Sequence, residues 1–145
     1  RPATLNDVAG LLELLEPLER RGMLVARSRE RLEHEIDDYM VIERDGMVIG
    51  CAALHVFPDT SIAELACVAV HDSYRGGERG ERLVEAMERR ARQRGLNEMF
   101  VLTTHTAHWF VERGFRAASL EDLPPLKRET YNHARKSKVL VKQLA

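Results

Sequence analysis

A short apolar strand that runs into a glycine-rich turn and then into a helix constrains this chain more than any other feature. Residues 64–71 read Glu-Leu-Ala-Cys-Val-Ala-Val-His, an apolar run whose length is typical of a buried strand. The turn at residues 75–81 holds three glycines, and apolar residues at helical spacing follow it. This spacing predicts a helix over about residues 79–94. A strand, a tight turn and a helix in this order predict an α/β fold.

The turn has the composition of an anion-binding site. Gly76, Gly77 and Gly80 can adopt positive φ and allow a phosphate to approach the backbone closely. The N–H groups of the turn and the positive end of the helix dipole favour negative charge at the same place. Arg75 and Arg79 add cationic donors there. The turn is neither a P-loop nor a GxGxxG dinucleotide motif, because a glutamate follows its last glycine and the glycine spacing differs.

Composition narrows the class of protein. The chain has 145 residues, which suits one domain, and a formal net charge of −1, which gives no excess of positive charge for binding nucleic acid. Its two cysteines do not make a disulfide framework, so a reducing, cytoplasmic setting is expected. No apolar run approaches the roughly 20 residues that span a bilayer. Because the chain begins at Arg1 and not at methionine, we expect it to be part of a longer protein.

The remaining sequence alternates helical and strand patterns. Thr4 is expected to cap a first helix, which Pro17 should kink or end, and Ser28 is expected to cap a second, shorter helix. Asp45-Gly46 between two apolar runs predicts a hairpin. Together these elements predict a sandwich of helices and a sheet of mixed strand direction. Further strands are expected over about residues 62–71, 99–103, 115–118 and 139–144, and short helices over about residues 106–113 and 124–133.

Two segments resemble motifs of the GNAT acetyltransferases. The turn resembles motif A of that family, Q/R-x-x-G-x-G/A, which wraps the pyrophosphate of acetyl-CoA. Arg75 and Gly80 match the first and last positions of the motif, whereas Glu78 stands where its first glycine usually lies. Residues 109–115, Trp-Phe-Val-Glu-Arg-Gly-Phe, look like the later GNAT motif, a short helix closed by Gly-Phe.

Over its whole length the chain is similar to the acetyltransferase domain of bacterial N-acetylglutamate synthases. The resemblance implies one GNAT domain over residues 1–145, with a mixed, twisted sheet and helices on both faces. It implies transfer of the acetyl group of acetyl-CoA to the α-amino group of L-glutamate, the first step of arginine synthesis. In that family an amino-acid-kinase-like domain precedes this one, and homo-oligomers are expected. The segments that carry the resemblance are residues 24–30, 66–71, 102–104, 108–110, 112–115 and 135–140.

The resemblance also implies where acetyl-CoA lies. In GNAT enzymes two neighbouring parallel strands separate and admit the pantetheine arm, and here these would end at Val70 and Thr103. Unpaired strand amides can then bind the pantetheine, and one N–H group would stabilise the tetrahedral oxyanion. The residues expected to contact acetyl-CoA are Cys67, Val68, Ala69, Val70, Arg75, Gly76, Gly77, Glu78, Arg79, Gly80, Glu81 and Phe110.

The acceptor amine arrives as an ammonium and must lose a proton before it attacks. Glu64, at the start of the motif strand, is the candidate general base, acting through water. The alternative interpretation is a solvated carboxylate at the end of a strand. His71 and His108 are weaker candidates, because a histidine more often serves as a local hydrogen-bond partner.

Two further questions stay open: which group protonates the departing thiolate, and whether Cys67 takes part in the reaction. The tyrosine that often protonates the thiolate in GNAT enzymes is replaced here by Phe110, which leaves Thr103, Thr104 or a water as the proton source. Cys67 could carry the acetyl group as a nucleophile, although a small apolar residue on a buried strand is the favoured interpretation.

Glutamate brings two carboxylates, which need cationic partners when they are buried. By resemblance, Arg27, Arg135 and Ser137 would bind this substrate. The alternative is that Arg27 belongs to a charged helix cap and that residues 135–138 form a solvated basic run. The His105-Thr-Ala-His108 segment lacks a metal-ligand motif, so no metal is expected.

Two other functions stay open. The first is a GNAT enzyme that acts on another small amine or on a protein N-terminus. The second is a non-catalytic acyl-CoA-binding module, which the departures at Glu78 and Phe110 favour.

Overall fold

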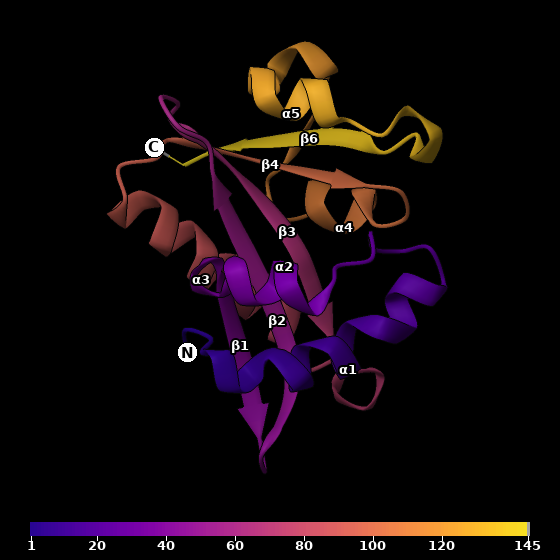
Figure 1. Cartoon of the computed structure of the whole chain (residues 1–145). Helices are drawn as coiled ribbons and strands as arrows, with labels where there is room; N and C mark the ends of the chain where they lie inside the picture. Colours follow the sequence, from indigo (N-terminus) through magenta and orange to yellow (C-terminus); the bar gives the residue numbers. More distant parts are fainter. Residues whose placement is uncertain (145) are drawn as a thin grey trace. The chain divides into compact units, whose positions relative to one another are not determined.

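The computed structural model describes residues 1–144, except for the side chain of Ala134. Within this range the chain forms a mixed sheet whose strand order is β1-β2-β3-β4-β6-β5, and Figure 1 labels these elements. β3 and β4 are parallel, whereas β1–β2, β4–β6 and β5–β6 are antiparallel, as the expected mixed direction requires. The strands are β1 (Tyr39–Arg44), β2 (Met47–Val56), β3 (Ile62–Val70), β4 (Glu98–Thr103), β5 (Arg116–Ala118) and β6 (Lys138–Gln143).

Helices alternate with these strands along the chain. The α-helices are α1 (Val8–Arg20), α2 (Arg29–His34), α3 (Arg79–Gln93), α4 (Ala107–Val111) and α5 (Pro125–Thr130). The 3-10 turns are η1 (Leu5–Asp7), η2 (Ile36–Asp38), η3 (Asp72–Tyr74), η4 (Leu120–Asp122) and η5 (His133–Arg135).

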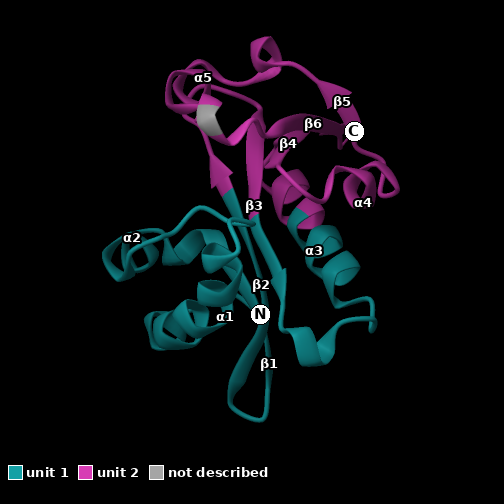
Figure 2. Ribbon diagram, turned by 90° about the vertical axis from the view of Figure 1, so that its right-hand side faces the viewer, with its two compact units in different colours: residues 1–54, 67–87 teal, residues 55–66, 88–145 magenta. Residues whose placement is uncertain are grey.

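The chain divides into two compact units, coloured separately in Figure 2. Unit 1 comprises Arg1–Leu54 and Cys67–Met87, and unit 2 comprises His55–Ala66 and Glu88–Ala145. β3 and α3 each contribute residues to both units. The turn that opens α3 therefore belongs to unit 1, whereas β4, α4, α5 and β6 belong to unit 2.

Unit 1 is built on the β1–β2 hairpin. Asp45 and Gly46 have φ values of 52° and 79°, the left-handed pair that a two-residue hairpin turn needs, so the predicted hairpin is confirmed. α1 and α2 lie on one side of its strands and the first part of α3 on the other (Figure 2). Gly10 of α1 packs so closely on β2 that a Cβ there would come within 2.8 Å of Val48 Cγ2.

The start of unit 1 confirms one local prediction and corrects another. Thr4 and Asp7 form a capping box around η1, and α1 follows directly. The expectation that Pro17 ends the helix is wrong, because α1 continues to Arg20. Pro17 lies near the end of α1, where it removes one backbone hydrogen bond, and the buried Leu18 still holds the last turn against the core. Gly22, with φ 72°, follows the end of the helix.

Replacement of Asp7 by asparagine should lower the free energy of unfolding by about 1–2 kcal/mol at neutral pH. Asp7 is buried, and its two carboxylate oxygens each lie 2.9 Å from the Arg1 guanidinium. This pair lowers the pKa of Asp7 from 3.8 to about 2. Because the folded-state pKa is the lower one, the stabilisation is complete above pH 3.8 and disappears as the pH falls toward 2. Urea unfolding across this pH range measures it; parallel curves for the two proteins would contradict the assignment.

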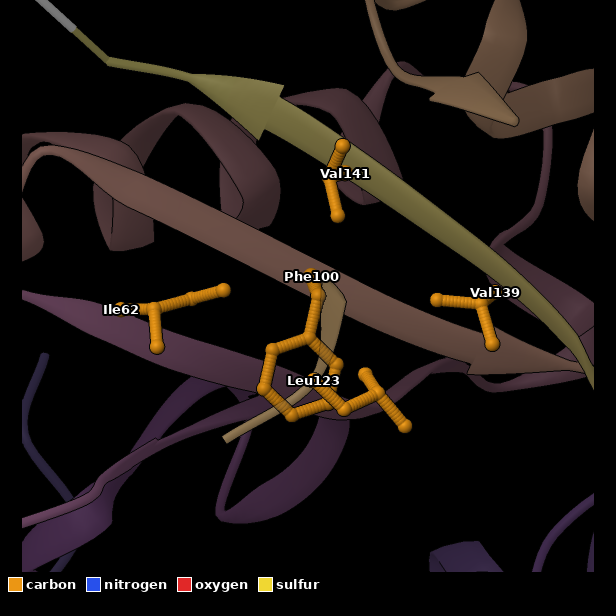
Figure 3. Packing of buried hydrophobic residues seen from close by; sticks show 5 residues of the cluster. All are labelled: Ile62, Phe100, Leu123, Val139 and Val141. Carbon is orange, nitrogen blue, oxygen red and sulfur yellow. The ribbon is translucent and has the colours of Figure 1, made fainter. Parts of the chain in front are cut away.

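Unit 2 is held together by one face of its strands. Ile62 and Glu64 of β3 pair in parallel with Glu98 and Phe100 of β4, and β4 pairs with β6 along its whole length. The side chains in Figure 3 gather around Phe100 on this face. The buried cluster consists of Ile62, Phe100, Leu123, Val139 and Val141.

Candidate active site

The parallel ladder between β3 and β4 is short. It ends at the pair Glu64–Phe100, although Leu65 and Ala66 continue β3 within unit 2 and β4 runs on to Thr103. Within the described residues of unit 2, the two strands thus stop pairing before either one ends. This is the local separation that the resemblance implied, and it leaves strand amides available for a ligand.

A left-handed residue interrupts β3 directly after this point. Cys67 has φ 54°, an uncommon conformation for a residue other than glycine and one that bends a strand. In unit 1 the Cys51 thiol donates to the Cys67 carbonyl oxygen at 3.2 Å, and the Tyr39 hydroxyl lies 3.7 Å from the Cys67 sulfur. Burial raises the pKa of the Cys51 thiol and of the Tyr39 hydroxyl, so both groups stay protonated and can donate. The sequence analysis did not identify this kink, because no glycine marks it.

The surroundings of Cys67 are those of a packed side chain. The residue is 4% exposed, and its thiol contacts the Tyr39 hydroxyl. A nucleophilic cysteine normally lies in an accessible, electropositive place that favours the thiolate. Its burial therefore fits the favoured interpretation, a small residue on a buried strand.

The glycine-rich turn differs in detail from the prediction. Among its three glycines, all within the described chain, only Gly76 has positive φ, at 87°. The second left-handed position is Glu78, with φ 61°, at the place where motif A usually has glycine. The Glu78 carbonyl accepts from Arg82 N at 3.0 Å, so Glu78 is the residue from which α3 begins. Gly80 lies in the first turn of α3, where helical φ is required, so it does not use its freedom to adopt positive φ.

The space beside Gly77 is filled by the end of the Arg79 side chain. The Arg79 guanidinium occupies the space where a Cβ of Gly77 would lie. There it donates to the Tyr74 carbonyl oxygen at 2.9 Å and lies 5.3 Å from the centre of the Tyr74 ring. Arg75 is exposed and lies 3.2 Å from Asp72. The two predicted cationic donors thus flank the turn, each already engaged within it.

Glu64 is buried, and this overturns the alternative of a solvated carboxylate. Its side chain is 10% exposed, and its Oε1 lies 3.0 Å from Lys127 Nζ on α5. No local sequence pattern indicates Lys127, because its partner Glu64 lies far from it in the chain.

The two histidines that were weaker candidates have local partners. His71 Nδ1 accepts from Ser73 N at 3.1 Å, which closes the turn after β3. The His108 side chain is 88% exposed and lies 3.4 Å from Glu112, one helical turn away. Both contacts are those of hydrogen-bond partners within a turn or a helix.

The hydroxyl groups after β4 differ from each other. Thr103 Oγ1 accepts from Thr106 N at 3.0 Å and lies 2.7 Å from Thr106 Oγ1, so it helps to start α4. Thr104 Oγ1 is buried and has no hydrogen-bond partner among the described residues. Phe110 is also buried and packs edge-on against Phe115, with their ring centres 5.4 Å apart.

Arg27 lies in unit 1 and is half-buried. Its Nη1 donates to the Val25 carbonyl oxygen at 3.2 Å, and its backbone N–H donates to a Glu19 carboxylate oxygen at 3.2 Å. The adjacent Ser28 caps α2 by accepting from Arg31 N at 3.1 Å, as predicted. The guanidinium of Arg27 is therefore not the cap of this helix.

The Arg135–Ser137 stretch lies in unit 2 and forms a turn that a side-chain hydrogen bond closes. Arg135 ends η5, Lys136 is left-handed with φ 54°, and the Tyr131 hydroxyl donates to the Ser137 carbonyl oxygen at 2.6 Å. Arg135 and Ser137 are both half-buried. Lys136 and Lys138 are exposed, as the alternative of a solvated basic run expects, whereas Arg135 and Ser137 are only partly exposed.

Neither a metal-ligand cluster nor a membrane-spanning helix occurs among the described residues. Within residues 1–144, no three His, Cys, Asp or Glu side chains lie together as a metal site would require. The helices formed by the same residues include none with the length and apolar character that crossing a bilayer requires.

A mixed sheet, a central strand with a left-handed residue and a glycine-rich turn that opens a helix define an α/β domain. The chain belongs to the acetyltransferase (GNAT) family, whose model matches residues 9–115. An amino-acid acetyltransferase of Mannheimia succiniciproducens is 56% identical over 144 residues, which cover 99% of this chain and 33% of that protein. The chain thus spans about a third of the length of the curated relatives that it matches.

Solved structures agree with this assignment. N-acetylglutamate synthase from Neisseria gonorrhoeae, complexed with coenzyme A and N-acetyl-glutamate, matches with a TM-score of 0.96 and 40% identity, over 100% of this chain and 34% of that one. Rv2747 from Mycobacterium tuberculosis, in complex with CoA and NLQ, matches with a TM-score of 0.84 over 100% of this chain and 98% of that one. At 22% identity, this second likeness shows the fold alone.

Proposed function

We propose that this chain transfers the acetyl group of acetyl-CoA to the α-amino group of L-glutamate and releases N-acetyl-L-glutamate and coenzyme A. The observation that carries the proposal is the match, over the whole of this chain and at 40% identity, to about a third of a synthase crystallised with coenzyme A and N-acetyl-glutamate. The names of the 56% and 54% identical relatives, both amino-acid acetyltransferases, support it.

The turn before α3 is proposed to hold the pyrophosphate of acetyl-CoA. Left-handed Gly76 and Glu78 turn the backbone ahead of α3, whose first N–H groups have no partners within the helix. Phosphate oxygens are suitable acceptors for such groups. Arg75 and Arg79 would add positive charge on either side, and the backbone of residues 67–70 would bind the pantetheine amides.

Replacement of Glu78 by glycine should tighten coenzyme A binding about fivefold and raise the free energy of unfolding by about 1 kcal/mol. The substitution removes a negative charge beside the proposed phosphate site and a side chain from a left-handed residue. Calorimetric titration and urea unfolding measure the two effects. Glu78→Gln is the matched control, since it removes the charge and keeps the Cβ, so it should improve binding alone. Weaker binding by Glu78→Gly would count against a phosphate at this turn.

The reaction is proposed to occur by direct attack within a ternary complex. Glu64 takes a proton from the substrate ammonium through a water, and the amine then attacks the thioester carbon. A C–N bond forms, and a strand N–H group near Cys67 stabilises the oxyanion. The C–S bond then breaks, and the proton that the new amide nitrogen gives up reaches the thiolate through Thr103, Thr104 or a water. A free thiol has a pKa of about 8.5, so this last step needs little assistance.

Arg27, Arg135 and Ser137 are proposed to bind the carboxylates of glutamate. A guanidinium pairs with both oxygens of a carboxylate, which suits a substrate that carries two of them. The hydrogen-bonded turn around Lys136 supports this role, because it holds the backbone of Arg135 and Ser137 in one conformation.

We further propose that the chain is the C-terminal part of a longer, cytoplasmic, oligomeric protein in which an amino-acid-kinase-like domain precedes it. The 33% coverage of the relatives supports the longer chain. Both cysteines are free, in agreement with a reducing compartment.

Two measurements on this chain test the proposal. Calorimetry should detect coenzyme A binding, and thiol release from acetyl-CoA should depend on L-glutamate, with L-glutamine and L-aspartate as poorer acceptors. Absence of heat with coenzyme A would overturn the whole proposal. Binding without turnover of any amine would favour an acyl-CoA-binding module, and faster turnover of another amine or of a peptide N-terminus would reassign the substrate.

A further inference from the structure

We propose that Lys127 is a positioning residue for the reaction, which holds the Glu64 carboxylate in one orientation. This inference rests on the proposed function, in which Glu64 is the general base. It adds a residue of α5 that none of the sequence motifs contains.

The contact between the two residues is direct. Lys127 Nζ lies 3.0 Å from Glu64 Oε1, and the two side chains are 23% and 10% exposed. A carboxylate this deeply buried keeps its charge only when a cation or several donors compensate the loss of water. Lys127 supplies that compensation and leaves the second oxygen, Oε2, free of this ion pair to meet a water or the substrate.

The surroundings of Glu64 make this cation important. Glu64 pairs with Phe100 across the parallel ladder and follows Ile62 by two residues, so it faces the same side as the apolar cluster of unit 2. Among the partly buried hydrophobic side chains packed against this cluster, Tyr131 is titratable, and its hydroxyl donates to the Ser137 carbonyl oxygen. β4 and β6 contribute Phe, Leu and Val side chains to this face, and η4 contributes leucine. A charge in such apolar surroundings depends strongly on its partner.

α5 also connects the candidate base with the candidate substrate-binding turn. Lys127 contacts Glu64 near one end of the helix, and Tyr131, directly after the other end, bonds to the Ser137 carbonyl oxygen at 2.6 Å. Pro124 and Pro125 fix the start of this short helix. The segment therefore holds two parts of the proposed site in a defined relation within unit 2.

Lys127→Met should lower kcat about tenfold, with the KM for acetyl-CoA unchanged. A loss in kcat without a change in this KM is the expected sign of positioning, because a misoriented base slows the chemical step and does not affect acetyl-CoA binding. Lys127→Arg should restore most of the rate, since it keeps a cation within reach. The rate measured is glutamate-dependent thiol release from acetyl-CoA, across about pH 5–9.

A second ion pair in unit 2 provides a matched control. Lys142 Nζ lies 3.0 Å from Glu88 Oε1, with exposures of 21% and 9%, nearly those of the Lys127–Glu64 pair. Lys142→Met removes an equally buried cation from Glu88, which has no proposed role in the reaction and keeps Arg92 at 3.7 Å. It should lower stability and leave kcat unchanged. An equal loss of kcat in both variants would overturn the positioning role.

A double variant keeps the test decisive if Lys127→Met does not fold. Glu64→Gln with Lys127→Met removes both charges and buries neither alone. If Lys127 acts through Glu64, the double variant should turn over at the rate of Glu64→Gln. A further tenfold loss would overturn the inference. Absence of turnover by the unaltered chain would instead overturn the proposed function, whereas turnover that Lys127→Met leaves unchanged would overturn the positioning role alone.

Discussion

Replacement of Glu64 by glutamine is expected to lower kcat by about 100-fold or more and to remove the acid side of the pH–rate profile. Glutamine keeps the shape of the side chain and cannot take a proton, so the ammonium of the substrate must lose its proton to bulk water. Acetyl-CoA binding should be unchanged, because its proposed phosphate site lies at residues 75–81 and not at Glu64. Steady-state kinetics against pH, together with calorimetry of coenzyme A, measures both quantities.

The glutamine variant carries its own structural risk. It leaves Lys127 half-buried without its carboxylate partner, so the free energy of unfolding has to be measured beside the rate. Glu98→Gln is the matched control, since Glu98 is a half-buried carboxylate on the neighbouring strand β4 and contacts Gln143. It should leave kcat unchanged. A Glu64→Gln protein that is folded and fully active would remove Glu64 from the mechanism.

Arg135→Ala is expected to raise the KM for glutamate about 10- to 100-fold and to leave the KM for acetyl-CoA within about twofold. The proposed contact is a charge-assisted pair between a guanidinium and a substrate carboxylate, and such pairs contribute about 1.5–3 kcal/mol. Arg27→Ala should behave in the same way. Arg135→Lys should recover part of the loss, because an ammonium keeps the charge but not the two parallel hydrogen bonds.

An exposed neighbour separates substrate recognition from general charge effects. Lys138→Ala removes a positive charge from an exposed position at the start of β6, close to Arg135 in the sequence. Its KM for glutamate should stay near that of the unaltered chain. Equal increases in the KM values for glutamate and acetyl-CoA in Arg135→Ala would contradict a role in substrate recognition and would indicate a disturbed turn.

Sequence patterns predicted the turn at residues 75–81 but not the backbone conformation of each of its residues. Motif A identified the turn at residues 75–81, and the structure places a left-handed residue at Glu78, where the motif expects glycine. Of the three glycines that could adopt positive φ, Gly76 does so. The Arg79 guanidinium fills the space beside Gly77, a contact that a sequence pattern does not contain.

Local chemistry alone determined much of this protein. Several elements follow from residues that are neighbours in the chain. These are the Asp45-Gly46 hairpin, the caps at Thr4 and Ser28, and the strand, turn and helix of residues 62–93. Backbone preferences and side-chain caps act over a few residues, so they can be predicted directly from the sequence.

Only the tertiary structure decided what surrounds the candidate residues. It buried Glu64 against Lys127, placed Tyr39 and Cys51 on the kink at Cys67, and bonded Tyr131 to Ser137. Most of these partners come from different elements, and the cost of burying a charge or of bending a strand depends on what packs there. That environment exists only once the chain has folded. The sequence therefore indicated Glu64 as a candidate but not Lys127, which contacts it in the folded chain.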